Sequence, residues 1–190
     1  DLGTISVGTI GNGGIAGNLG QATNASTNIV LGGGTLKYTG STATSDRAFT
    51  ITAGTTGTID VPTGVTLTLA GATGTTTTGA LTKTNSGTLN LSGVNTYTGT
   101  TTISAGTLAI TGSGSLNSGS YAGSIVDNAT FIYSSSATQT LSGVISGTGA
   151  LTKDTDTSSV LTLSNTNTYT GVTTINAGTI SVGTIGNGGA

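Results

Sequence analysis

The chain lacks several side chains on which much protein chemistry depends. Its 190 residues include no histidine, cysteine, methionine, tryptophan or glutamate. Without histidine or cysteine, neither Ser-His-Asp nor Cys-His machinery can be assembled in its usual form. Zinc or copper sites built on those ligands are excluded too. We therefore expect no enzyme and no cofactor, and we assign no catalytic, metal-binding or cofactor-binding residue.

Charge is also scarce, at 5% of residues with a formal net charge of −2. A nucleic-acid partner would need a basic stripe to neutralise phosphates, so that class is excluded. No apolar run approaches the roughly 20 residues of a membrane helix, so we expect no membrane insertion by this segment. Disordered chains usually combine low hydrophobicity with high net charge. This chain is 33% hydrophobic, which favours an ordered structure.

All six acidic residues are aspartates, at positions 1, 46, 60, 127, 154 and 156. Paired carboxylates about 5–9 Å apart can hydrolyse glycosides, so Asp154 and Asp156 are considered as a candidate catalytic pair. They have threonine and serine neighbours and no aromatic sugar platform, and one pair supplies too few ligands for calcium. We interpret them as part of a solvated loop. Asp46 and Arg47 are interpreted as a corner ion pair, with a contact to a neighbouring coil or subunit as the alternative.

Threonine is the commonest residue and glycine follows with 34 copies, and both suit pleated strands and tight turns. Leu-x-Leu at 67–69, 89–91 and 161–163 shows the alternation of a half-buried strand. Such runs are short before Gly, Asn, Ser or Thr interrupts them. Aromatics are only 4%, which favours a narrow core of stacked Leu, Ile, Val and Ala. The pattern predicts an all-β fold.

Internal similarity is the strongest feature of the sequence. Residues 89–110 (LNLSGVNTYTGTTTISAGTLAI) recur at 161–182 (LTLSNTNTYTGVTTINAGTISV) with an offset of 72. GALTK at 79–83 recurs at 149–153, so the repeats span 79–110 and 149–182, the second with two extra residues. A repeat of that length is expected to fit about three coils of roughly 20–25 residues each.

The chain also repeats its own beginning. Residues 3–14 and 178–189 both read GTISVGTIGNGG, at an offset of 175. We therefore expect residues 1–190 to be one β-solenoid segment, drawn from a tandem unit whose length equals that offset. In such a fold each strand bonds to the equivalent strands above and below, roughly 4.8 Å away.

An open solenoid end exposes unpaired strand N–H and C=O groups. Neither end of this sequence has an amphipathic capping helix, and Pro62 is the only proline. We therefore expect uncapped ends, with the chain itself as partner, head to tail or as tandem copies. The candidate residues of this end-to-end interface are Ile5, Val7, Ile10, Ile180, Val182 and Ile185.

The most distinctive polar motif is Asn-Thr-Tyr-Thr-Gly, at 95–99 and again at 167–171. A ligand site could use its tyrosine and asparagine. The preferred interpretation is structural: asparagine satisfies backbone groups of a turn, and tyrosine covers the end of a core layer. The residues concerned are Asn95, Tyr97, Gly99, Asn167, Tyr169 and Gly171.

At these repeats the chain resembles a known family. GALTKTNSGTLNLSGVNTYTGTTTISAGTL at 79–108 and GALTKDTDTSSVLTLSNTNTYTGVTTINAGTI at 149–180 resemble the autotransporter-associated β-strand repeat, also called the passenger-associated transport repeat. The resemblance implies a right-handed parallel β-helix, here of roughly seven to nine coils. It also implies export to the bacterial cell surface or the extracellular space. In the family this repeat is scaffold, and some members are adhesins.

Several function classes remain open. The favoured one is a structural segment of an extracellular fibre or stalk. The alternative is an adhesin that binds glycans or surfaces, which requires a cluster of exposed tyrosine, asparagine or aspartate. Ice binding and action on polysaccharides are two further alternatives. Ice binding needs threonines in register on one face, whereas the Thr-rich stretches at 66–68, 75–78 and 100–102 are expected to be scattered.

Overall fold

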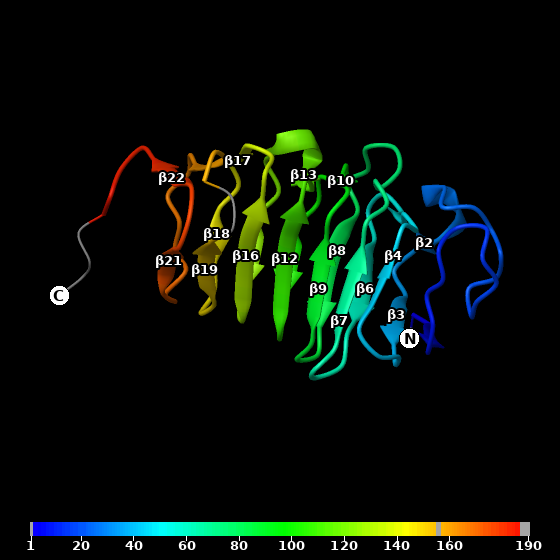
Figure 1. Ribbon diagram of the computed structural model, residues 1–190. Helices are drawn as coiled ribbons and strands as arrows, with labels where there is room; N and C mark the ends of the chain where they lie inside the picture. The colour runs from blue at the N-terminus through cyan, green and yellow to red at the C-terminus, as the bar shows by residue number, and fades with distance from the viewer. Residues whose placement is uncertain (1, 155–156, 187–190) are drawn as a thin grey trace.

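The computed structural model describes residues 2–154 and 157–186, and these residues wind into a parallel β-solenoid (Figure 1). The coils are stacked side by side, with β2 and β3 toward one end of the stack and β21 and β22 at the other (Figure 1). The strand pairings among the described residues are all parallel, for example β12 with β9 on one side and β16 on the other. The predicted fold class, an all-β parallel solenoid, is therefore confirmed.

Three sheets form the sides of the solenoid, and the third begins only with β14. The first sheet consists of β1 (Thr4–Val7), β3 (Thr35–Tyr38), β6 (Thr56–Asp60), β8 (Ala80–Thr84), β11 (Thr101–Ile103), β15 (Ile125–Asp127) and β18 (Ile145–Ser146). The second consists of β4 (Ala43–Ser45), β7 (Thr66–Leu69), β9 (Thr88–Leu91), β12 (Thr107–Gly112), β16 (Thr130–Ser135), β19 (Ala150–Lys153) and β21 (Thr173–Ile175).

The third sheet consists of β14 (Ser120–Tyr121), β17 (Gln139–Leu141), β20 (Val160–Leu163) and β22 (Thr179–Val182). Two short pairs complete the strands: β2 (Val30–Leu31) with β5 (Thr50–Ile51), and β10 (Val94–Asn95) with β13 (Ser115–Leu116). The helical segments in the described residues are two 3-10 turns, η1 (Ser26–Asn28) and η2 (Asn117–Gly119). No helix among the described residues has the length and apolarity to cross a membrane.

The core is a set of side-chain columns that run from coil to coil. In the second sheet Leu67, Leu89, Leu108, Phe131 and Leu151 are successive partners, and each is 0% exposed. Because side chains alternate along a strand, the residues between the inward positions face outward, and most of them are polar, as at Thr68, Asn90 and Thr152. Each large apolar side chain buried in this way contributes about 1.5–3 kcal/mol, so the free energy of folding grows with the number of stacked coils.

Most coils are close to the expected length, but the first is longer. On the second sheet Thr68 pairs with Asn90, and Asn90 pairs with Ala109 on the next strand. On the first sheet Thr4 pairs with Thr35, which is a longer step along the chain. The difference lies in residues 8–29, which form no strand between β1 and β2.

The repeat at an offset of 72 does not return to the same side of the solenoid. Strand β9, in the first copy, belongs to the second sheet, whereas its equivalent β20 belongs to the third. Strand β8 belongs to the first sheet and its equivalent β19 to the second. The expectation of about three coils was therefore incomplete, because the offset spans three coils and one further side. Similar sequences can occupy different sheets because every sheet offers the same alternation of inward and outward positions.

Candidate functional site

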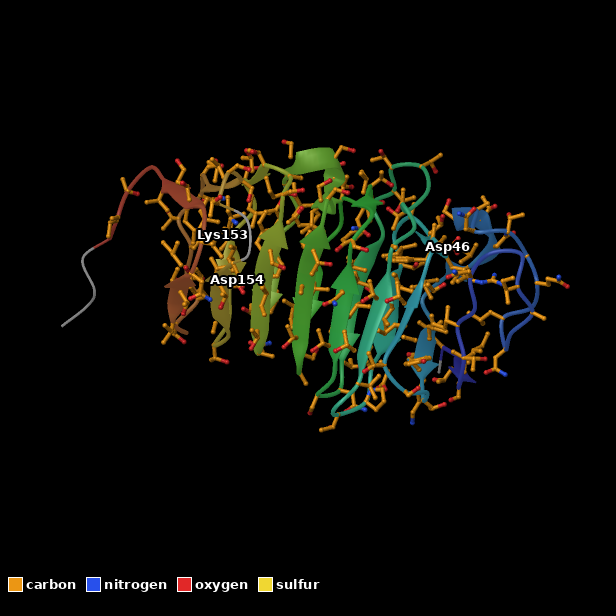
Figure 2. All side chains as sticks on the ribbon, in the orientation of Figure 1. Asp46, Lys153 and Asp154 are labelled. Atoms are coloured by element: carbon orange, nitrogen blue, oxygen red, sulfur yellow. The ribbon has the colours of Figure 1, made fainter. Side chains whose placement is uncertain are left out.

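The aspartates among the described residues do not converge on one site. Asp46 lies toward the N-terminal end of the molecule and Asp154 toward the opposite end (Figure 2). Asp60 is on the first sheet, where it accepts hydrogen bonds from Thr84 Oγ1 (3.2 Å) and Asn85 Nδ2 (3.3 Å). Within residues 2–154 and 157–186 no three carboxylates come together to hold a metal ion. Asp156, the second member of the sequence pair, lies outside the described residues.

The tyrosines form no exposed cluster either. Tyr38, Tyr97, Tyr121 and Tyr133 are each 2% exposed or less, and Tyr169 is half-buried. Their hydroxyls bond at corners: Tyr38 donates to Ser41 O (2.7 Å) and Tyr133 to Ala137 O (2.6 Å). The rings therefore fill the ends of core layers, and their polar tips satisfy the backbone of the adjacent turn.

The first Asn-Thr-Tyr-Thr-Gly motif sits in a buried polar cluster. Thr101 Oγ1 lies 3.0 Å from the Tyr97 hydroxyl and 2.8 Å from the Tyr121 hydroxyl, and the two rings meet edge to face with centroids 5.9 Å apart. Asn95 Nδ2 donates to Gly93 O (2.8 Å) and Ser115 O (3.2 Å). Burial raises the pKa of both Tyr97 and Tyr121, so the phenols stay neutral and serve as hydrogen-bonding groups.

The second motif keeps the contact of its tyrosine, whereas its asparagine has different partners. The Tyr169 hydroxyl lies 2.5 Å from Thr173 Oγ1, which repeats the contact between Tyr97 and Thr101 at the same spacing along the chain. Asn167 Oδ1 accepts a hydrogen bond from Ile145 N (2.8 Å), in the preceding coil. In both copies the asparagine and the tyrosine bond to groups of the protein.

The glycines that end the two motifs have no room for a side chain. A Cβ on Gly99 would lie 2.4 Å from Gly79 O, and one on Gly171 would lie 2.0 Å from Gly149 O. Both contacts are with the backbone of the preceding coil, which cannot move without breaking the ladder. Glycine is therefore required here by the close approach of two coils.

Four charged side chains are buried among the described residues: Asp127, which is 1% exposed, and three cations whose burial the sequence interpretation missed. Lys83 and Lys153 are 0% exposed and Arg47 is 1% exposed. Lys83 Nζ donates to the carbonyls of Thr84 (2.7 Å), Asn85 (2.6 Å) and Ala105 (3.3 Å). Burial lowers its pKa to about 8, although the carboxylate of Asp60 acts in the opposite direction. The alternation of Leu81 and Lys83 in one strand was the available signal that this lysine faces inward.

Asp46 and Arg47 both bind the irregular first coil. Asp46 Oδ1 accepts from Gly13 N (2.7 Å), while Arg47 donates through Nε to Gly11 O (3.0 Å) and through a terminal nitrogen to Gly20 O (2.8 Å). The contact to a neighbouring coil, weighed as the alternative, is therefore the observed one. These bonds hold the loop against the edge of β4, so the N-terminal edge of the second sheet is partly covered.

The Thr-rich stretches at 66–68 and 100–102 lie on different sheets, but the structure also aligns other outward threonines in a column that the sequence analysis did not find. Thr4, Thr35, Thr58, Thr82 and Thr102 are successive partners on the first sheet. The column then continues with Val126, and in the neighbouring column Thr56 pairs with Ala80. The register follows from the stacking of coils, which aligns residues that are far apart in the sequence. The valine and the alanine interrupt a regular two-column threonine array.

The six interface candidates lie at the two ends of the solenoid but differ in exposure. Ile5, Val182 and Ile185 are 61%, 43% and 88% exposed, Ile180 is half-buried, and Val7 and Ile10 are buried. Each end has a hollow, which is mainly apolar at the N-terminal end and has a mixed polar and apolar lining at the C-terminal end. One, of about 200 Å³, is lined by Ile5 and Leu36 among others, and the other, of about 790 Å³, by Leu163, Ile180 and Val182 among others.

Comparison with known proteins agrees with this architecture. The model of the passenger-associated transport repeat matches residues 81–110 and 158–182. Over 220 aligned residues the chain is 39% identical to the adhesin BmaC autotransporter of Brucella suis biovar 1 (strain 1330). The alignment covers 99% of this chain and 6% of that adhesin. No solved structure matches the chain.

The repeat match and the similarity over nearly the whole chain agree with the stacked parallel strands and the buried columns. The two matched segments contain β8 to β12 and β20 to β22, so they form strands in all three sheets. The chain therefore carries passenger-associated transport repeats at residues 81–110 and 158–182, within a parallel β-solenoid that is similar over nearly its whole length to part of an autotransporter adhesin.

Proposed function

We propose that this chain is a structural β-solenoid segment of a much longer exported protein, where it acts as a stiff spacer at the bacterial cell surface or outside the cell. In this role it has no catalytic activity. Its partner is a further copy of the same unit, joined end to end in a tandem chain or by head-to-tail stacking. The product is a long fibre or stalk.

The observation that carries this proposal is the continuity of the ladders. Seven strands of the first sheet and seven of the second pair in unbroken succession. The columns of the core run in the same direction, and a hollow lies at each end of the solenoid. A parallel ladder has no intrinsic end, because each edge strand still offers N–H and C=O groups to another strand. The structure is thus suited to extension.

The electron-microscopic length of chains with one, two and three units tests the proposal. Each unit added through the shared GTISVGTIGNGG sequence is expected to lengthen the particle by roughly 35–40 Å at constant width, given a coil spacing of about 4.8 Å. Particles that become wider instead of longer, or that bend freely between units, would contradict the spacer role. The same chains displayed beneath a terminal epitope tag show whether the epitope moves outward with each unit.

An adhesive role is the second candidate, and one observation favours it: the similarity to a protein named as an adhesin. In that case the outer faces of the coils bind glycans or host surfaces. The test is retention of the purified chain on a glycan panel and on matrix-coated plates. Saturable binding that is competed by free glycan supports adhesion by this segment. Absence of binding leaves the spacer role and assigns adhesion to other parts of the parent protein.

A further inference from the structure

The two identical 12-residue segments, 3–14 and 178–189, place the same strand sequence at the two ends of the solenoid. Strand β1 and strand β22 both read TISV. Strand β1 is the edge strand of the first sheet and pairs with β3, whereas β22 is the edge strand of the third sheet and pairs with β20. The pairing of β1 therefore shows which strand of the following coil pairs with a TISV strand. The pairing of β22 shows which strand of the preceding coil does so.

The neighbours of β22 and the neighbours of β1 can be combined into one continuous ladder. The column Leu163–Val182 at one end corresponds to the column Val7–Tyr38 at the other, and Leu161–Ile180 corresponds to Ile5–Leu36. Leu161, Leu163, Leu36 and Tyr38 are all buried, so both sets of neighbours face the interior. Joined through a shared TISV strand, they form two unbroken inward columns of large apolar side chains.

The exposure of the two copies shows what the second one lacks. Val7 is 2% exposed and Ile10 is 4% exposed, whereas their equivalents Val182 and Ile185 are 43% and 88% exposed. Val7 is covered by the coil that follows it, through its partner Tyr38. A coil with the sequence of β3 laid on β22 would bury Val182 in the same way.

We propose that β22 is the junction with a second copy of this unit in the same chain, and that each unit is turned by one side of the solenoid relative to the unit before it. The second unit's β3 pairs with β22 in the register that β3 has with β1, so that Thr179 meets Thr35, Ile180 meets Leu36, and Val182 meets Tyr38 of the second unit. Since β22 lies on the third sheet, the strands that form the first sheet in one unit continue the third sheet of its predecessor. A given outward residue then returns to the same side after every third unit.

A tandem copy fits better than a separate molecule. In a separate chain, the edge of β3 that would receive β22 is already occupied by that chain's own β1, through Thr35 N to Gly3 O (2.9 Å) and Thr39 N to Val7 O (2.8 Å). A second molecule would have to displace β1, whereas in a tandem chain β22 is itself the β1 of the next unit. The inference rests on the proposed spacer function, but the two fail separately. A two-unit chain that lengthens without turning keeps the spacer role and loses the inference.

The test uses a two-unit chain made of residues 1–189 followed by residues 15–190. No foreign linker is needed, because residues 178–189 repeat residues 3–14. The protein has no cysteine, so a pair of introduced thiols is unique. One variant carries Thr179→Cys with Thr35→Cys of the second unit, which are neighbours in the proposed ladder. Its matched control carries Thr168→Cys with the same Thr35→Cys. Thr168 lies in the coil after β18, on the side of the first sheet, and its N–H donates to Ile145 O of β18 (2.8 Å).

A short bis-thiol reagent that spans one strand spacing is expected to crosslink the first variant in at least about tenfold higher yield than the control. Crosslinking of the control, or of neither variant, overturns the proposed turn. A third sample mixes single-unit chains that carry Thr179→Cys or Thr35→Cys, and no crosslink is expected there. Equal crosslinking in that mixture overturns the tandem assignment and identifies a separate molecule as the partner.

Cryo-electron microscopy of the cysteine-free two-unit chain gives a readout that does not depend on the variants. The expected strand order on the third sheet is β17, β20, β22, and then β3 and β6 of the second unit. A map in which the second unit's β3 continues the first sheet, or in which β22 remains an unpaired edge, contradicts the inference.

Discussion

The two copies of the internal repeat, 89–110 and 161–182, have similar sequences in different surroundings. Ile103 in the first copy is 0% exposed, and Ile175 in the second is 55% exposed. Tyr97 is 2% exposed, whereas Tyr169 is half-buried. The first copy has a coil on both sides, since β11 pairs with β8 and β15, but β21 pairs only with β19 among the described strands. The comparison shows that the burial of an inward side chain in this fold depends on the coils that pack against its own.

The largest difference is expected for isoleucine truncation. Ile103→Ala removes a buried side chain from a column with partners on both sides and should lower the free energy of unfolding by about 2–5 kcal/mol. Ile175→Ala, its matched control, should cost less than about 1 kcal/mol because its side chain is more than half exposed. Urea denaturation followed by circular dichroism measures both. Equal losses would contradict the dependence of burial on the neighbouring coil.

Alanine substitution of the corner glycines should lower the stability by similar amounts in the two copies. Gly99→Ala and Gly171→Ala both force a Cβ against a carbonyl of the preceding coil, which each copy has. Both should be destabilised by about 1–3 kcal/mol or more. Gly183→Ala is the control, because a Cβ there meets nothing within 4 Å. A loss at Gly99 alone would show that the preceding coil does not restrain the second copy.

Removal of the tyrosine hydroxyls should again cost more stability in the first copy than in the second, but by a smaller amount than the isoleucine truncation. Tyr97→Phe deletes one member of the buried Tyr97–Thr101–Tyr121 cluster and should cost about 0.5–1.5 kcal/mol. Tyr169→Phe should cost only a few tenths of a kcal/mol, since water can replace the lost partner at a half-buried position. Thermal unfolding of the two variants beside the parent chain gives the comparison. A larger loss at Tyr169 than at Tyr97 would be inconsistent with it.

A further effect is expected from pH, through the buried Lys83, which precedes the first copy in the sequence. Lys83 has a pKa of about 8 in the folded chain, below its ordinary value of 10.5. Between these values the unfolded chain binds more protons, so stability should rise as the pH increases from about 8 to 10. Above pH 10 the buried tyrosines act in the opposite direction, because their folded pKa values are raised.

The urea midpoint measured between pH 7 and 10 tests this expectation. The Lys83→Met variant should be less stable throughout, because three carbonyls lose their donor, but its midpoint should not rise with pH. A rise that persists in the variant would assign the pH dependence to another group.

Much of the fold could be predicted from local patterns. Leu-x-Leu at 67–69, 89–91 and 161–163 lies in β7, β9 and β20, each with alternating burial. The buried Lys83 and Arg47 were not predicted, since a charged residue in a polar stretch reads as a surface group. Their burial depends on the carbonyls of Ala105 and Gly11, in other coils. The threonine column of the first sheet was missed for the same reason, because its successive members lie a whole coil apart in the sequence.

The sequence by itself determined that this chain forms short parallel strands, that its coils repeat, and that its chemistry is poor in catalytic groups. The short strands follow from a period of two and the poverty in catalytic groups from composition, whereas the repeating coils and their parallel stacking follow from sequence similarity at fixed offsets and from the family resemblance. Only the tertiary structure decided which sheet each repeat occupies, which isoleucines are buried, and where TISV meets the next coil. Those outcomes depend on the unequal lengths of the coils and on contacts between them, which no local pattern encodes.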